Sequence, residues 1–464
     1  MSVTRNDPPG VAARRAALKL LDAVLRRGLP LEGALASATT ELDRADDRGL
    51  AHAIAAAVLR RLPDLDALID SATKKPLPLD AKARFLLRIA FAQALLLETP
   101  GHAAIATVLP LADGGPRKLV HGVFGALMRQ GATLPELPTL PGLLGDRWRA
   151  AWGREAVEGA RRALLSPPPL DIMLANPGTT DAWVERLGGT SLAAGHVRLP
   201  AGTRVAELPG YAEGDWWVQD IAASLPARLF GPGEGKRALD LCAAPGGKTM
   251  QLAAAGWRVT AVDASESRMA RLRENLARTR LTAETVVADA LFYSPESQFD
   301  AVLVDAPCSA TGIFRRHPDV LHRVRPKAIA GLAEQQRAIL ARAAQAVKPG
   351  GRLVYAVCSL EREEGEQVAD WFLSSRSDFA PMAFVSSALQ HMFPGEGRGP
   401  VGNGPILDPG LRRGTDLVQT GFVAPNTPAH MIRIPPGALV EVGGADGFFV
   451  AMFHKKDERP LAPG

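Results

Sequence analysis

The chain has 464 residues, of which 47% are hydrophobic and 22% are charged. This balance is ordinary for a soluble globular protein and excludes disorder along the whole chain. Three cysteines are too few for a disulfide framework and predict a reducing, cytoplasmic setting. The polar opening 1–10 contains no secretory signal, and no charge-free apolar run reaches ~18 residues, so we expect neither export nor a membrane span. A net charge of +5 favours a polyanionic partner only weakly.

The first part of the chain, residues 1–130, predicts an all-helical domain. Apolar residues recur at helical spacing and no strand pattern interrupts them. The helical segments that this spacing predicts are 11–28, 49–62, 81–97 and 117–130. Residues 131–145 are rich in proline and glycine and predict a linker.

Residues 146–215 predict a small α+β module. A helix over 146–165 ends at three prolines, a short strand follows at 171–176, and a second helix is indicated over 181–187.

From residue 216 to residue 464 short apolar strands alternate with helices. Such alternation predicts a mostly parallel sheet covered on both faces, a Rossmann-like α/β domain. The strands expected are 238–242, 258–262, 285–288, 301–304, 352–357 and 447–453. A segment rich in glycine and proline, 392–430, predicts a long surface loop.

A glycine loop, CAAPGGKT over 242–249, lies between the first strand of this domain and a helix. Glycines allow close approach of a ligand, and a helix N-terminus offers free N–H groups. The loop fits neither the Walker A pattern nor GxGxxG. Asp263, Asp289 and Asp305 follow the next three strands, where acids can bind a ribose or an adenine. These residues alone leave NAD and S-adenosylmethionine both open.

Two further motifs carry a family resemblance. DAPCSATG over 305–312 and VCSLEREEGE over 357–366, with CAAPGGKT, resemble the RNA 5-methylcytosine methyltransferases that use S-adenosylmethionine. IFRRHPDV over 313–320 is similar to the RsmB group of that family, which methylates 16S ribosomal RNA. DGFFVAMF over 446–453 resembles the family's closing strand. The N-terminal helices resemble a NusB-like RNA-binding domain, and the middle module resembles the family's small RNA-binding module.

The resemblance implies a set of cofactor contacts. Asp263 would bind the ribose, Asp289 would lie by the adenine, and Asp305 would border both cofactor and target base. The methionine moiety would be held by the backbone of Cys242, Ala243, Ala244, Pro245, Gly246, Gly247 and Lys248. Two departures are mild: Val357 stands where the family often has threonine, and His121 where asparagine is common.

Methylation at C5 of cytosine needs a nucleophile, because C5 becomes reactive only after addition at C6. A thiolate suits this step. The resemblance makes Cys358 the nucleophile and Cys308 the group that assists product release, with Asp305 as general acid at the base edge and Lys248 as a positioning group. The opposite assignment stays open, because Pro307-Cys308 resembles the nucleophile motif of DNA cytosine methyltransferases.

Arg315, Arg316 and His317 follow the second motif and are candidates for RNA phosphate contacts. The acidic run 361–364 is expected to cap and solvate the following helix. No metal site is expected, because the cysteines are 66 and 50 residues apart without a CxxC or paired histidines.

The sequence therefore predicts a cytoplasmic, monomeric enzyme that methylates a cytosine of 16S rRNA. Two alternatives remain: the same chemistry on tRNA or 23S rRNA, and a non-catalytic NusB-like RNA-binding protein. A dehydrogenase is disfavoured because the GxGxxG loop is absent.

Overall fold

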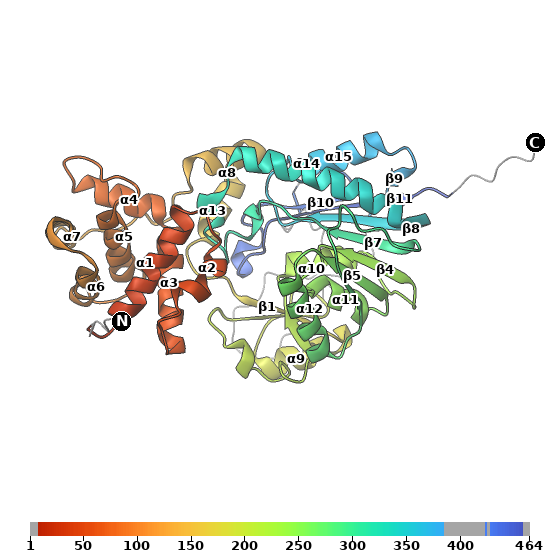
Figure 1. The fold of residues 1–464 in the computed structure, drawn as a ribbon, viewed down its shortest axis with the longest axis horizontal. Coiled ribbons are helices and arrows are strands. Elements are labelled where there is room, and N and C mark those ends of the chain that lie inside the picture. Colours follow the sequence, from red (N-terminus) through yellow and green to blue (C-terminus); the bar gives the residue numbers. More distant parts are fainter. Residues whose placement is uncertain (1–7, 385–422, 425–426, 458–464) are drawn as a thin grey trace, which may run out of the picture. The chain divides into compact units, whose positions relative to one another are not determined.

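The structure is a computed structural model that describes residues 8–384, 423–424 and 427–457. Most of the segment 392–430, predicted as a surface loop, lies outside these residues. The chain forms two compact units. Figure 1 shows the fold coloured by residue number. The helical unit contains Met1–Arg147, Leu164–Ser166 and Phe314–Val324, and the sheet unit contains Trp148–Ala163, Pro167–Ile313 and Arg325–Gly464.

The helical unit confirms the all-helical prediction for the N-terminal part of the chain. Its helices are α1 (Val11–Leu25), α2 (Leu31–Ala38), α3 (Ala45–Arg60), α4 (Leu62–Ser71), α5 (Lys82–Leu96), α6 (Gly101–Val108), α7 (Gly114–Arg129) and α13 (Val320–Arg323). The helix α8 (Gly142–Ala163) continues from this unit into the sheet unit.

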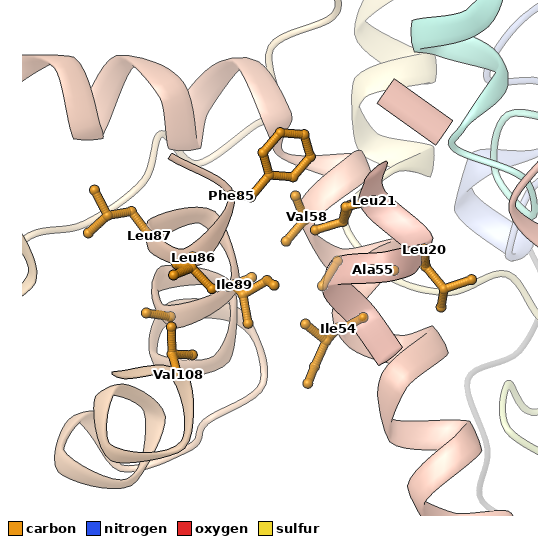
Figure 2. Packing of buried hydrophobic residues seen from close by; sticks show 14 of the residues in the cluster. Leu20, Leu21, Ile54, Ala55, Val58, Phe85, Leu86, Leu87, Ile89 and Val108 are labelled. Atoms are coloured by element: carbon orange, nitrogen blue, oxygen red, sulfur yellow. The ribbon is translucent and has the colours of Figure 1, made fainter. Parts of the chain in front are cut away.

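The core of the helical unit lies between α1, α3 and α5. Figure 2 shows Leu21 of α1 beside Val58 of α3, with Ile89 of α5 on the other side of Val58; Leu20 and Ile54 belong to the same cluster. Alanines such as Ala51 and Ala55 fill the α3 positions between the larger side chains and let α1 approach closely. Burial of this apolar surface, at about 25 cal/mol per Å², is the main force that holds these helices together.

A segment from late in the sequence completes the helical unit. Asp319 accepts a hydrogen bond from the Leu31 amide at the start of α2, with its Oδ2 3.3 Å from that nitrogen. A ring nitrogen of His322 lies 2.7 Å from the carbonyl oxygen of Leu59. Residues 314–324 are thus part of the same packed body as α1–α7.

The sheet unit is built on an eight-stranded sheet in the order β10-β11-β8-β7-β4-β5-β6, with β9 beside β11. Strands β4 to β8 pair in parallel, while β11 is antiparallel to β8. The strands are β4 (Arg237–Leu241), β5 (Arg258–Asp263), β6 (Glu284–Val287), β7 (Phe299–Asp305), β8 (Val347–Val357), β9 (Phe379–Pro381), β10 (Met431–Ile434) and β11 (Phe448–Lys455).

Helices cover both faces of this sheet, so the predicted three-layer α/β arrangement is confirmed. Neighbouring strand residues point to opposite faces: Leu303 packs with one core and Val302 with the other. The helices α10 (Ile221–Arg228), α11 (Gly247–Ala254) and α12 (Glu266–Thr279) cover one face, and α14 (Pro326–Ala343) and α15 (Glu366–Ser375) cover the other, as Figure 1 shows.

A second, three-stranded sheet precedes the large one in sequence. It has the order β2-β1-β3 and consists of β1 (Leu170–Leu174), β2 (His196–Leu199) and β3 (Trp216–Val218), with the helix α9 (Thr180–Leu187) packed against it. Trp216 pairs with Leu174, so this small sheet uses residues just beyond the boundary expected at 215. Among the described residues, no helix combines the length and apolar character needed to cross a membrane.

Candidate active site

The glycine loop leaves β4 and enters α11 in a backbone conformation that favours glycine. Gly246 has a φ of 104°, and a Cβ there would lie 2.8 Å from Cγ of Leu272. A Cβ on Gly247 would lie 3.3 Å from the side chain of Gln219. Because a Cβ at position 246 would clash with Leu272 and φ is positive there, this turn into the N-terminus of α11 favours glycine.

Asp263, at the end of β5, fastens this loop to the sheet. Its carboxylate is buried, with Oδ2 accepting from the Ala244 amide at 3.2 Å and Oδ1 from the Ser265 amide at 2.9 Å. Arg268 donates to Oδ1 as well, at 2.8 Å, although its own side chain is largely exposed. Asp263, the residue predicted to bind the ribose, therefore also holds the loop in place. The sequence patterns did not indicate a role for Arg268. The one feature that could have pointed to it is its position five residues after Asp263.

A second buried acid, Asp240 on β4, lies beneath the loop. Thr249 donates to its Oδ2 at 2.6 Å, and its Oδ1 has no hydrogen-bond partner among the described residues. Burial raises the pKa of Asp240 to about 7. The sequence analysis missed this residue, although a single acid inside the apolar strand ALDLC is a readable signal.

Lys248 and Asp305 form an ion pair at the same edge of the sheet. Nζ of Lys248 lies 2.7 Å from Oδ2 of Asp305 and 5.4 Å from the centre of the Phe448 ring. Burial lowers the pKa of Lys248, but the charge of Asp305 and the hydrogen bond to it outweigh burial, so the pKa is raised. Lys248 is therefore a buried cation beside a carboxylate that stays partly accessible.

Two cysteines meet next to this pair. Cys308 follows β7, Cys358 follows β8, and their sulfur atoms are 3.5 Å apart. The pKa of Cys308 is raised well above its ordinary value, by the hydrogen bond to Cys358 first, then by burial and the nearby negative charges. The third cysteine, Cys242, has a pKa that burial raises to about 12. All three are free thiols.

Hydrogen bonds join the segments that carry the two cysteines. The Gly312 amide donates to the Cys358 carbonyl at 3.0 Å, and the Leu360 amide donates to Oγ1 of Thr311 at 2.9 Å. The expectation that the acidic run 361–364 solvates the next helix is wrong for Glu361 and Glu364, which are buried. They accept internal hydrogen bonds, Glu361 from the Trp148 indole at 3.0 Å.

The remaining predicted residues lie in two places. Asp289 is exposed on the loop after β6, beside the end of β5, because the Ala288 amide donates to the Asp263 carbonyl. Arg315, Arg316 and His317 belong to the segment within the helical unit. Arg315 is 2% exposed, so a phosphate contact from it would require movement, whereas the other two are half-buried. Among residues that the structure describes, no cluster of three or more potential ligands could hold a metal ion.

Family comparisons agree with this architecture. Residues 227–454 match the family described as 16S rRNA methyltransferase RsmB/F, and residues 11–129 match the NusB family. The fold and the matched families together define an RNA methyltransferase with a NusB-type helical domain. The chain is 35% identical over 420 residues to the ribosomal RNA small subunit methyltransferase B of Xanthomonas campestris, which spans 83% of this chain and 94% of that protein. The chain therefore belongs to the RsmB family of ribosomal RNA small subunit methyltransferases.

Solved structures share the fold at lower identity. A structure described as PH0851 is 22% identical, covers 97% of this chain and 100% of its own, and gives a TM-score of 0.69. NSun6 from Pyrococcus horikoshii with SFG is 17% identical, covers 68% of this chain and 99% of its own, and gives a TM-score of 0.52.

Proposed function

We propose that this chain transfers a methyl group from S-adenosylmethionine to C5 of a cytosine in 16S rRNA, through a covalent adduct between a cysteine and C6. One observation carries the proposal. Two thiols 3.5 Å apart lie next to a Lys–Asp pair, at the strand edge from which the glycine loop emerges. Addition of a thiolate, contact with the base edge and delivery of a methyl group can therefore occur in one place.

The residues around the glycine loop fit this cofactor. The backbone of 242–248 would hold its methionine moiety, where a Cβ on Gly246 would clash with Leu272 and one on Gly247 would press on Gln219. The unpartnered Oδ1 of Asp240 offers a buried acceptor nearby. Asp263 would bind the ribose and Asp289 would lie by the adenine. SFG, which accompanies the similar NSun6 structure, is an analogue of S-adenosylmethionine. When bound, the cofactor supplies an electrophilic methyl group.

The protein's own groups then act on the base. The Cys358 thiolate adds to C6, and this addition moves an electron pair toward C5. The Lys248–Asp305 pair supplies a proton to N3 at the same time. Once C5 carries the methyl group, the N3 proton returns to the Lys248–Asp305 pair and water takes the C5 proton. The electrons of the C5–H bond re-form the C5=C6 double bond as the C6–S bond to Cys358 breaks. Cys308 would assist this release, and the 3.5 Å between its sulfur and that of Cys358 supports the assignment.

The substrate proposal comes from the relatives and from the helical domain. The similar proteins are named for the small-subunit RNA, and the NusB match places a second domain beside the methyltransferase in the sequence. We propose a monomer in the cytoplasm that needs no metal. The free thiols are typical of a reducing compartment.

The test is to incubate the intact protein with labelled S-adenosylmethionine and undermodified 16S rRNA, 23S rRNA or tRNA. Each RNA is then digested and the labelled nucleoside is identified. Label in 5-methylcytidine from 16S rRNA alone is the expected result. Label from another RNA would move the substrate and keep the chemistry. No label from any RNA or ribosomal particle would overturn the enzymatic proposal and favour a binding protein.

A further inference from the structure

Glu364 is a fully buried carboxylate behind the two cysteines. It is 0% exposed, and its two oxygens accept four hydrogen bonds. The Ser309 amide (2.8 Å) and the Gln336 side chain (3.1 Å) donate to Oε1. The hydroxyls of Ser309 and Ser359 donate to Oε2. An ionised carboxylate has about four acceptor sites, so the set of donors is complete.

These four donors come from three separate pieces of chain. Ser309 directly follows Cys308, Ser359 directly follows Cys358, and Gln336 belongs to α14. Gln336 also donates to the Pro307 carbonyl at 2.9 Å, on the other side of Cys308. A single carboxylate therefore fixes the residues next to both sulfur atoms.

We propose that Glu364 is a positioning residue for the two-cysteine reaction: its buried carboxylate fastens the Cys308 segment to the Cys358 segment and sets a negative charge behind Cys308. The inference rests on the proposed function, since it gives the two thiols different tasks. The four hydrogen bonds of Glu364 go to Ser309, Gln336 and Ser359, so it acts through these residues and need not touch the substrate. Nothing in the sequence pattern suggested this role, because the acidic run was expected to be solvated.

The charge of Glu364 acts on a thiol that several other groups surround. Cys358 faces Cys308 from the end of β8, and Tyr355 faces it from within β8, where its hydroxyl donates to Gln336 at 3.1 Å. The Lys248–Asp305 pair lies at the neighbouring strand edge. Among the causes that raise the pKa of Cys308, the hydrogen bond to Cys358 comes first and the negative charge of Glu364 adds to burial. The charge of Glu364 therefore favours the neutral form of Cys308, the thiol to which the proposed function gives product release.

The four hydrogen bonds that Glu364 accepts from Ser309, Gln336 and Ser359 are called the clamp below. Two substitutions separate the effect of this clamp from the effect of the negative charge. In Glu364→Gln the amide oxygen can accept from the Ser309 and Gln336 N–H groups, while the two serine hydroxyls rotate to accept from its NH2 group. The clamp persists and the charge is lost. In Glu364→Ala both are lost. Ser309→Ala is the milder clamp variant, because it removes one hydroxyl donor and keeps the amide bond. The matched control is Glu361→Gln, an equally buried acid in the same loop that bonds to Trp148.

The charge is read by alkylation of the free protein with iodoacetamide between pH 6 and pH 10, with each cysteine quantified by peptide mass spectrometry. Glu364→Gln should speed alkylation of Cys308 about tenfold at a given pH, because a nearby negative charge has been removed. Cys242 serves as the internal reference, and Glu361→Gln should match the parent. An unchanged Cys308 rate in Glu364→Gln would overturn the charge bias. This assay needs no RNA, so it stands apart from the identity of the substrate.

The effect of the clamp is measured as the kcat of methylation, with the RNA that accepts label as substrate. Glu364→Ala should lower kcat about 100-fold, the usual scale for misplacing reacting groups by about 1 Å, with the Kd for S-adenosylmethionine unchanged. Glu364→Gln should stay within about threefold of the parent and Ser309→Ala about tenfold below it. A folded Glu364→Ala protein with parental kcat would overturn the clamp. Should Glu364→Ala not fold, Ser309→Ala with parental kcat overturns it.

Discussion

At the scale of single residues, environment rather than residue type separates the three cysteines. Cys242 lies in the cofactor loop with a pKa that burial raises to about 12. Cys308 and Cys358 share one hydrogen bond, but Glu364 lies behind the Cys308 segment and raises the pKa of that thiol further. The motifs singled out the two cysteines that the structure brings together. Neither motif could indicate that Glu364, Asp240 or Arg268 would be partners of the site, because those contacts depend on distances set by tertiary structure.

The roles proposed for Cys358 as nucleophile and Cys308 in product release predict opposite outcomes for their alanine variants. Cys308→Ala should still attack the base but release product slowly, so a covalent protein–RNA adduct should accumulate with S-adenosylmethionine present. Cys358→Ala should form no adduct and lose methylation by more than about 1000-fold, as expected for removal of a nucleophile. Denaturing gels of protein with labelled RNA measure the adduct. The variant that carries both substitutions is the negative control. If an adduct forms with Cys358→Ala and not with Cys308→Ala, the roles of the two cysteines must be exchanged.

Asp240 predicts a pH dependence of stability. Its pKa is about 7 in the folded protein, against about 3.9 for an unperturbed aspartate. Because the folded state favours the protonated form, this residue stabilises the fold below pH 4, and that contribution is lost as pH rises through 7. Asp240→Asn cannot ionise, so it should gain stability over the parent by about 2–4 kcal/mol at pH 8 and by little at pH 4. Urea unfolding without cofactor measures this. A difference that does not change with pH would refute the argument.

At the scale of elements, the sequence predicted the large sheet well and the short helices poorly. Strands β4, β5, β7 and β11 are mostly apolar runs next to turn residues, which is the pattern of strands buried on both faces. The helices α2, α4 and α6 have only 8, 10 and 8 residues, too few for a clear helical period, and were not predicted. β10, with 4 residues, was also missed, because its place beside β11 follows only from the fold.

The close crossing of two backbone segments makes Gly312 indispensable. A Cβ on Gly312 would lie 1.9 Å from the carbonyl oxygen of Gly447 and 3.0 Å from that of Cys358. Gly312→Ala must therefore displace its own segment from Gly447 and strain the hydrogen bond from the Gly312 amide to the Cys358 carbonyl, so methylation should fall more than about 100-fold. Gly331→Ala on α14 is the control, because nothing lies within 4 Å of its Cβ position. It should keep parental activity and gain at most about 1 kcal/mol of stability. Parental kcat in a folded Gly312→Ala protein would contradict this reading.

At the scale of the whole molecule, the two compact units are not consecutive stretches of the chain. Domains predicted as 1–130, 146–215 and 216–464 are consecutive, whereas residues 314–324 belong to the helical unit although the sheet unit flanks them on both sides. Local sequence patterns cannot reveal such a return, because it depends on contacts between residues nearly 300 positions apart, such as Leu31 with Asp319. The chain thus passes from Cys308, near the proposed site of chemistry, into the NusB-type unit within six residues.

This return predicts the behaviour of a truncated chain. A chain of residues 146–464 lacks α1 to α7 but keeps the segment in which Phe314, Val320 and Leu321 are no more than 3% exposed. Without the helices these apolar side chains face water, so the truncated chain should bind a hydrophobic dye and elute as aggregates where the intact protein does not. Size-exclusion chromatography and dye fluorescence measure this. Replacement of Phe314 and Leu321 by serine should restore solubility only to the truncated chain, and in the intact chain it should destabilise the helical unit by about 3 kcal/mol or more. A monodisperse truncated chain without dye binding would show that the segment is stable apart from the helical unit.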